Sequence, residues 1–284
     1  MTAPGAPRTT IVSVAWNSAD VLPAMLASIP QGVPVVVVDN AGTDASGEIA
    51  RAAGAHVVRL EENLGFGRGC NAGAALAGTE FLLFLNPDAA LEPGALAALE
   101  AAADAHPDAS GFNPRIRDRN GQAYFKRGSI LLARRERLAR GWPEESGPVP
   151  VLSGAAFFCR RAQFEAEGGF DPAIFLYHED DDLSLRLKQR FGPLRFVREA
   201  EIVHLEGRGS PRNPETARIK SYHMARSRVY TMRKHGRPFP VLGSLAGAIL
   251  KLLSPANLVS ARKRAQALAY VKGVVSRVGE RSEG

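Results

Sequence analysis

Four carboxylates stand side by side at residues 179–182, in the stretch FLYHEDDDLSLRL, between an aromatic run and a leucine-rich run. Adjacent negative charges repel one another, so this group needs either positive partners or a chemical use. Three roles are open to it: a cap at the start of a helix, a cation site, or a proton acceptor in an active site. The rest of the chain has to decide among them.

Three further polar clusters each follow an apolar run of strand length. They are Trp16-Asn17, Asp39-Asn40 and Asn86-Pro87-Asp88. One such cluster alone usually belongs to a turn or a helix cap. In a parallel sheet, however, the carboxyl ends of the strands open onto one edge, and ligands bind beyond that edge. Three clusters at one edge therefore favour a ligand site over three unrelated turns.

A glycine-rich segment, NLGFGRGCNAG at residues 63–73, follows the third apolar run. Its glycines allow the backbone to approach a ligand closely, and a helix beginning there would offer N–H groups to phosphate. The segment matches neither GxGxxG nor GxxxxGK[ST], and no GxGxxG follows the first apolar run. The sequence therefore argues against a nicotinamide dinucleotide site and against a P-loop ATPase.

Strand-like and helix-like segments alternate over the first hundred residues and would position these clusters. Strands are predicted at 9–16, 33–40, 56–60 and 81–86, and helices at 20–29, 44–53, 69–78, 93–106 and, further on, 179–191. Strands separated by helices imply right-handed crossovers and a largely parallel sheet. After residue 111 the pattern loosens, and Asn120-Gly121 predicts a hairpin turn.

A helix that begins at the four carboxylates would separate them, because each residue turns by about 100°. On that rotation Asp180 shares a face with Leu183 and Leu187, whereas Asp181 and Asp182 project more towards water or other loops. An inward carboxylate beside other acids is a good proton acceptor, because desolvation and repulsion disfavour its charged form. We therefore predict Asp180 as a base; the alternative is that all four carboxylates only cap the helix.

The chain has 284 residues, of which 45% are hydrophobic and 23% charged. This composition argues against a disordered chain and allows one large domain or two smaller ones. The two cysteines have no metal-binding spacing, and the first residues contain no apolar core of signal-peptide length. We therefore expect a cytoplasmic protein.

The C-terminal part is strongly basic. Residues 205–284 carry 16 Lys/Arg and 4 Asp/Glu, against 20 and 25 in the part before them. The apolar run at 238–253 falls short of the about 20 residues that a spanning helix needs, and 260–279 mixes cations with apolar residues. We expect 238–279 to contact an anionic membrane, peripherally on the inner face of the cytoplasmic membrane. Docking on the body or an oligomer contact is the alternative.

In their order and spacing, these motifs resemble those of family 2 glycosyltransferases, in particular the bacterial rhamnosyltransferase-like branch. The resemblance covers about residues 9–235 and rests on VVVVDNAGTDAS, NLGFGRGCNAG, FLLFLNPDA, LSGAAFFCRR, GGFDPAIFLYHEDDDLSLRLKQRFG and IVHLEGRGS. It implies the GT-A fold, an α/β fold with a Rossmann-like, mostly parallel central sheet flanked by helices. It also implies an inverting enzyme that uses a nucleotide-activated sugar.

The resemblance assigns roles to residues that bind the substrates. It places Asp39 on the nucleobase and Asn71 near the nucleoside. Asp180 matches the aspartate of the family's ED motif, the base that takes the proton of the acceptor hydroxyl. The substrate-binding residues predicted here are Ala15, Asn17, Asp39, Asn40, Asn71, Asn86, Gly154, Tyr177 and Glu179.

The resemblance also implies a metal site. Asn86-Pro87-Asp88 corresponds to the metal-binding DXD motif, with Asn in place of the first Asp, and His204 corresponds to a further metal contact. We therefore predict Asp88 and His204 as ligands of a divalent cation that bridges the two phosphates. Hard oxygen ligands suit Mg²⁺ or Mn²⁺, and the imidazole favours Mn²⁺.

The sequence thus predicts a metal-dependent glycosyltransferase with a lipid-linked or cell-envelope glycan as acceptor, and dTDP-rhamnose is the first donor to test. Residues 1–235 would form the GT-A domain, with a nucleotide-sugar half at about 9–110 and an acceptor half at about 111–235. Residues 236–284 would form a basic amphipathic helical tail.

Two other functions compete with this prediction. A sugar-phosphate nucleotidyltransferase would carry a basic, glycine-rich signature after the first strand, and AWNSADVLPA lacks it. A non-catalytic protein that binds anions or nucleic acid through the tail is the second alternative. No nucleic-acid-binding module is visible, so no nucleic acid partner is expected.

Overall fold

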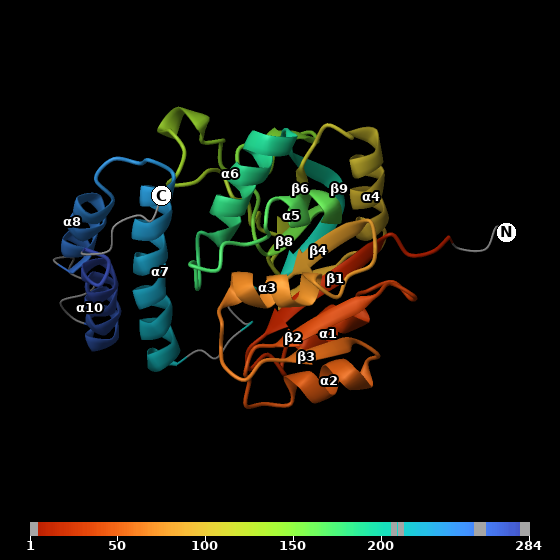
Figure 1. Ribbon diagram of the computed structural model, residues 1–284, viewed down its shortest axis with the longest axis horizontal. Helices are drawn as coiled ribbons and strands as arrows, with labels where there is room; N and C mark the ends of the chain where they lie inside the picture. Colours follow the sequence, from red (N-terminus) through yellow and green to blue (C-terminus); the bar gives the residue numbers. More distant parts are fainter. Residues whose placement is uncertain (1–4, 206–208, 210–212, 253–259, 279–284) are drawn as a thin grey trace.

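The computed structural model describes residues 5–205, 209, 213–252 and 260–278. Figure 1 shows an α/β body beside a group of C-terminal helices. The body is built on one nine-stranded sheet, so the predicted fold class is confirmed. Part of the IVHLEGRGS motif and residues 253–259 and 279 of the expected membrane contact lie outside the described residues.

Four strands of the sheet are parallel and adjacent. They are β1 (Thr9–Ala15), β2 (Val35–Asp39), β3 (His56–Arg59) and β4 (Phe81–Leu85). Their order is β3-β2-β1-β4, an arrangement that helical crossovers produce. Every residue of β1 and β4 is buried, because helices cover both faces of a parallel sheet, and this explains the nearly continuous apolar runs.

The remaining strands make the other half of the sheet mixed. They are β5 (Ala89–Leu91), β6 (Gly111–Arg117), β7 (Gly147–Val149), β8 (Ala156–Arg160) and β9 (Leu194–His204). β8 runs antiparallel to β4 and β6, and β9 pairs with β6 in parallel and with β5 and β7 in antiparallel. The register of β5 sets Ala89 opposite His204, which brings His204 next to Asp88.

Helices pack on both faces of this sheet (Figure 1). They are α1 (Leu22–Ala27), α2 (Ser46–Ala52), α3 (Phe66–Ala74), α4 (Ala95–Ala105), α5 (Arg161–Ala166) and α6 (Glu179–Phe191). Alternate residues of β1 serve the two faces: Ile11 and Ala15 share a core with α1, α2 and α4, and Val12 and Val14 share one with α3, α5 and α6. One sheet therefore separates two cores.

The predicted strands and helices of the first hundred residues are all present. α3 begins at Phe66 rather than at residue 69, directly after Gly65, whose φ of 85° turns the chain into the helix. α6 has the predicted limits. The predicted hairpin turn is also found, with Gly121 at a φ of 79° and a bridge between Arg117 and Ala123.

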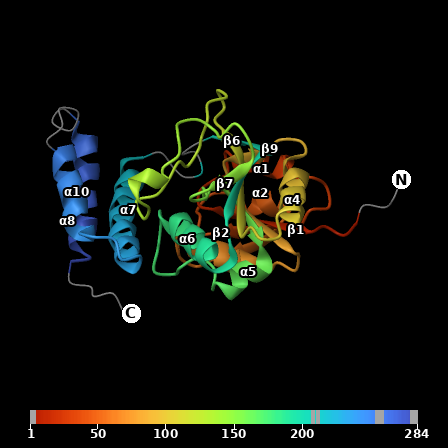
Figure 2. The same ribbon diagram turned by 90° about the horizontal axis from the view of Figure 1, so that it is seen from above.

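The C-terminal extension is helical, as predicted. Its described residues contain α8 (Pro240–Leu252) and α10 (Ala261–Val275), which pack on α7 (Pro214–Lys234). Figures 1 and 2 both show α7 between these two helices and the body. A Cβ on Gly273 of α10 would lie 2.3 Å from the carbonyl oxygen of Tyr222 in α7, so the close approach of the two helices requires glycine there. Among the residues described, no helix is long and apolar enough to cross a membrane.

Candidate active site

A cavity of about 570 Å³ lies at the carboxyl ends of β1 and β4. Trp16 and Asn86, which follow these strands, form part of its wall, and the first turns of α7 close another side through Thr216 and Ile219. Eight of the predicted site residues line this cavity: Asn40, Asn86, Asp88, Gly154, Tyr177, Glu179, Asp180 and His204. The strand ends therefore meet at one edge, as the parallel-sheet argument requires.

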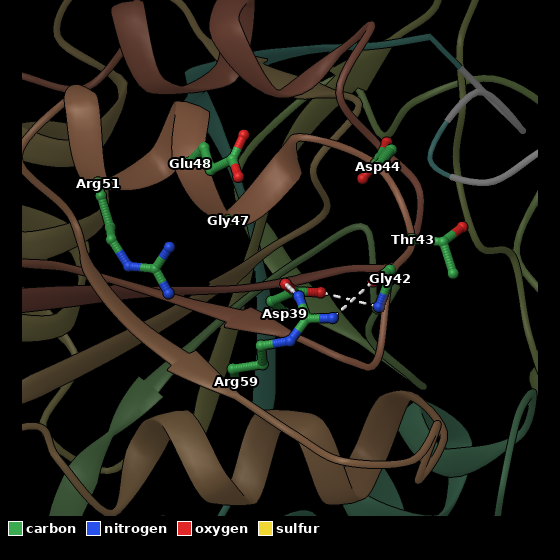
Figure 3. Close-up of a pocket in the computed structure, with 8 residues that line it drawn as sticks. All are labelled: Asp39, Gly42, Thr43, Asp44, Gly47, Glu48, Arg51 and Arg59. Carbon is green, nitrogen blue, oxygen red and sulfur yellow. Dashed lines mark hydrogen bonds and ion pairs between the residues drawn. The ribbon is translucent and has the colours of Figure 1, made fainter.

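Asp39 lies in a second cavity, of about 380 Å³, at the end of β2. Its side chain is buried, forms an ion pair with Arg59, and accepts a hydrogen bond from the backbone N–H of Gly42 at 2.9 Å. Figure 3 shows the guanidinium of Arg59 beside Asp39, with the side chains of Thr43 and Asp44 further away. A carboxylate next to a guanidinium offers an acceptor and donors side by side, which suits the edge of a nucleobase.

Three predicted substrate contacts do not line either cavity. Ala15 is fully buried in the core. The side chain of Asn17 accepts a hydrogen bond from the backbone N–H of Thr43 at 2.7 Å. The amide of Asn71 donates to the carbonyl of Phe170 at 2.8 Å and accepts from its N–H at 2.9 Å. Asn17 and Asn71 thus hold loops in place around the site.

Asp88 and His204 form a pair at the wall of the larger cavity. Oδ1 of Asp88 lies 3.2 Å from Nε2 of His204, and Oδ2 of Asp88 accepts a hydrogen bond from Gly209 at 2.8 Å. The side-chain amide of Asn86 is 3.4 Å from the same Nε2. Both members of the pair are buried, and their polar atoms converge at the cavity wall.

These residues fit a divalent cation that has other ligands as well. A carboxylate and an imidazole are suitable donors for Mn²⁺, and the amide of Asn86 adds an oxygen within reach after rotation. No group of three or more His, Cys, Asp or Glu suited to a metal occurs in the part of the chain that the structure describes. With Asp88 and His204 as its protein ligands, a cation would take its other ligands from phosphate oxygens and water.

Asp180 reaches the larger cavity from the start of α6. Its Oδ2 accepts a hydrogen bond from the backbone N–H of Gly154 at 2.8 Å and lies 2.6 Å from Nζ of Lys126. The two residues that precede the helix are Tyr177 and His178, and their φ values are 67° and 70°. Such left-handed backbone is strained for residues other than glycine and is concentrated at functional sites. Asp180, the predicted base, therefore lies in the helical turn that directly follows this strained backbone.

Of the two surroundings predicted for Asp181 and Asp182, water or other loops, the structure shows neighbouring segments of the protein. Both residues are buried, because α6 is covered on more than one side. Lys126 and His178 lie 2.9 Å from Asp181, and their charges outweigh burial and hold its pKa below the ordinary value. Burial also raises the pKa of Asp182, but His235 and the cations Arg186 and Lys234 lower it to about 2.

Lys126 is a site residue that the sequence did not indicate. It comes from the irregular segment between β6 and β7, and its ammonium lies between Asp180 and Asp181 at 2.6 and 2.9 Å. Burial lowers its pKa, but the two carboxylates outweigh burial and raise the pKa above its ordinary value. A lone lysine in a loop has no pattern, so only the tertiary contact reveals it.

Lys126→Met should lower kcat/KM for sugar transfer by up to about 100-fold, because the carboxylate of Asp180 loses the ammonium group, 2.6 Å away, that helps to hold it in the cavity. The measurement is kcat/KM for sugar transfer by the purified chain. Lys188→Met, on the exposed side of α6, is the matched control and should transfer sugar at the native rate. An unchanged kcat/KM in Lys126→Met would separate Lys126 from the proposed base.

Glu179 is the carboxyl group of this cluster with the raised pKa. Burial is the largest cause, and repulsion from Asp180 adds to it, so that the pKa rises to about 8. Its Oε2 is buried and has no hydrogen-bond partner among the described residues. The raised pKa favours the neutral form of Glu179, which can donate a hydrogen bond at the cavity wall.

Glu179→Gln should remove a pH dependence of stability. The folded state holds the Glu179 proton more tightly than the unfolded state, so the free energy of unfolding falls as pH rises from about 4.5 to about 8, by at most about 1.4 kcal/mol per pH unit. Urea unfolding at both ends of this range should show the variant gaining stability over the native chain as pH rises. Glu62→Gln, at an exposed position, should show no such gain.

Comparison with known proteins agrees with this geometry. The family described as Glycosyl transferase family 2 matches residues 10–167, more than half of the chain. The N-acetylglucosaminyl-diphospho-decaprenol L-rhamnosyltransferase of Mycobacterium tuberculosis is 29% identical over 252 residues, which cover 75% of this chain and 80% of that protein.

Two solved structures share the fold. The mannosyltransferase PcManGT from Pyrobaculum calidifontis, in complex with GDP-Man and Mn²⁺, has a TM-score of 0.61 at 17% identity and covers 95% of this chain and 88% of its own. TarS 1–349 of S. aureus has a TM-score of 0.58 at 16% identity, with coverages of 97% and 93%. These similarities establish the GT-A fold.

Proposed function

The chain belongs to glycosyl transferase family 2 and is a glycosyltransferase of GT-A fold, and we propose that it transfers rhamnose, a deoxyhexose, from dTDP-rhamnose to a lipid-linked glycan. The transfer would invert the configuration at the anomeric carbon. The observation that carries this proposal is the meeting of Asp180 with the Asp88–His204 pair in one cavity. A base and a phosphate-side cation site in a single cavity are what glycosyl transfer from a nucleotide diphosphate needs.

The donor would bind across the two cavities. The carboxylate of Asp39 and the guanidinium of Arg59 would face the base, and Trp16 and Asn40 would line the path towards the sugar. Thymine presents an N–H between two carbonyl oxygens, so a carboxylate flanked by a guanidinium complements it. The relative from M. tuberculosis, named as an L-rhamnosyltransferase, supports rhamnose as the sugar to test first.

Asp88 and His204 would hold a divalent cation, Mn²⁺ or Mg²⁺. When bound, such a cation stabilises the negative charge of the departing nucleotide diphosphate as a Lewis acid. PcManGT was solved with Mn²⁺, and the imidazole of His204 also favours Mn²⁺. Because Asn86 replaces an acid, this chain supplies less negative charge to the cation than a DXD motif does.

Asp180 would accept the proton of the acceptor hydroxyl as that oxygen attacks the anomeric carbon. The N–H of Gly154 and the ammonium of Lys126 contact this carboxylate at 2.8 and 2.6 Å and would hold it in place. Aromatic side chains of Tyr124, Phe175 and Tyr177 line the same cavity and offer flat surfaces to a sugar ring. The neutral carboxyl of Glu179 would donate to a sugar oxygen.

A panel of nucleotide sugars tests this function directly. The purified chain would be incubated with each donor, Mn²⁺ or Mg²⁺, and an envelope lipid extract, and release of nucleotide diphosphate would be measured. dTDP-rhamnose should give the highest turnover, which should stop on chelation of the metal. No turnover of any donor, together with pyrophosphate release from a nucleoside triphosphate and a sugar phosphate, would favour a nucleotidyltransferase instead.

We also propose that the enzyme works at the surface of the cytoplasmic membrane, on its inner face, where nucleotide sugars are available. The relative from M. tuberculosis is named for a decaprenol-linked acceptor, and a lipid-linked acceptor confines the reaction to a membrane surface.

A further inference from the structure

Exposed large apolar side chains gather on the C-terminal helices. Of nine such side chains in the described residues, seven lie between residues 239 and 278. Four of these are between 51% and 73% exposed and belong to α8 or directly precede it: Phe239, Leu242, Ile249 and Leu250. We call these four, with the exposed Ala246 between them, the α8 apolar face.

The α8 apolar face is one continuous surface. With a rotation of about 100° per residue, its four members within α8 fall within an arc of about 100°, and Phe239 directly precedes the helix. The opposite side of the helix packs through Val241 and Leu245 onto the small core of α7 and α10. A helix that is apolar all round belongs in a protein core or in lipid, and the protein covers this one on a single side.

The charge of the same region is entirely positive. Residues 236–279 contain seven Lys/Arg and no Asp or Glu. Arg262 and Lys263 are exposed in the first turn of α10, which holds no acidic residue. The helix dipole disfavours cations at this end, so their position does not serve the stability of α10. It suits an external anionic surface.

We propose that the α8 apolar face docks into the surface of an anionic lipid bilayer, with Arg262 and Lys263 on the lipid phosphates. α8 has 13 residues and is about 20 Å long, too short for the about 30 Å of a hydrocarbon core. It therefore lies in the interface rather than across it. A hydrated interface with an acidic protein would engage the cations, but it would not account for the exposed apolar side chains.

The position of α7 connects this surface to the active site. The first turns of α7 line the cavity through Thr216 and Ile219, and its later turns carry α8 and α10. A bilayer held by α8 would thus lie along the helix that forms a wall of the acceptor side. The inference rests on the proposed function in this respect: it names the surface from which a lipid-linked acceptor is reached.

Vesicle flotation of the full chain tests the proposal. The vesicles would be pure phosphatidylcholine, or phosphatidylcholine with about one third phosphatidylglycerol. The native chain should float with the anionic vesicles only. Leu242→Ser/Leu250→Ser should weaken binding at least about tenfold, and Arg262→Gln/Lys263→Gln about fivefold for each cation. Leu76→Ser, an exposed leucine of the body, is the matched control and should bind like the native chain.

Two results would overturn the proposal. The first is undiminished flotation of Leu242→Ser/Leu250→Ser. The second is a concentration-dependent dimer of the native chain that this variant abolishes without any change in vesicle binding, which would assign the face to a second copy. Thermal unfolding of each variant should match the native chain, since the replaced side chains are exposed.

Nucleotide release with a water-soluble acceptor analogue separates this proposal from the enzymatic one. Leu242→Ser/Leu250→Ser should keep the native rate on a soluble acceptor and lose it on an acceptor embedded in anionic vesicles. Vesicle binding without any sugar transfer by the native chain would refute the function and leave the docking surface. Sugar transfer without vesicle binding would refute the docking surface and leave the function.

Discussion

Asp180→Asn is expected to lower kcat for sugar transfer by about 10²–10⁴-fold, because an amide cannot take the proton of the attacking hydroxyl. Asparagine keeps the size of the side chain and retains an oxygen for the N–H of Gly154, which now lies 2.8 Å from the carboxylate. Donor affinity should therefore stay within a few-fold of the native value. The measurement is single-turnover transfer with saturating donor, beside calorimetric titration with the nucleotide diphosphate.

The control for this change is Asp20→Asn, which removes an exposed carboxylate shortly after β1. It should transfer sugar at the native rate. Full transfer by Asp180→Asn with normal donor binding would remove Asp180 from the role of base. In that case Glu179, the neighbouring carboxyl with a pKa of about 8, would be the next candidate.

Asp88→Ala is expected to weaken metal-dependent binding of the nucleotide diphosphate by at least about 100-fold, more than the loss of an outer contact to a metal ligand costs. The change removes the only carboxylate at the end of β4 and leaves Nε2 of His204 without the oxygen now 3.2 Å away. His204→Ala should have a smaller effect, because it removes a neutral ligand. Titration of the nucleotide with Mn²⁺ present and absent measures both.

Metal dependence distinguishes this outcome from simple unfolding. Asp88→Ala should still bind nucleotide weakly without the metal, at the affinity of the metal-free native chain. If Mn²⁺ enhanced binding to Asp88→Ala and to the native chain equally, the cation would have to lie elsewhere.

The strand ends could be predicted from sequence because they depend on local patterns. Apolar runs predict β1, β2 and β4. If these strands pair in parallel, the residues that follow them must lie at the same edge of the sheet. Asn40, Asn86 and Asp88 lie there as predicted. His204 joined them through the pairing of β9 with β5, which no local pattern reveals; only the family resemblance pointed to it.

The surroundings of the base could not be predicted in the same way. Helical rotation separates faces but does not say how many of them are covered. α7 brings Lys234 and His235 onto Asp182, and an irregular segment brings Lys126 onto Asp181. The side chain of Asn71 likewise donates a hydrogen bond to the backbone of Phe170, which is distant in sequence. Each of these contacts is tertiary and leaves no periodic signal.

The proposed function combines sugar transfer from a nucleotide diphosphate to a lipid-linked acceptor with Asp180 as base. Transfer of label from radioactive dTDP-rhamnose into the organic phase of an envelope lipid extract measures both parts. We expect label in the lipid with the native chain and Mn²⁺, and we expect chelation or Asp180→Asn to keep it in the aqueous phase. Label that stays in the aqueous phase with the native chain, for rhamnose and every other labelled donor, would refute the proposed function.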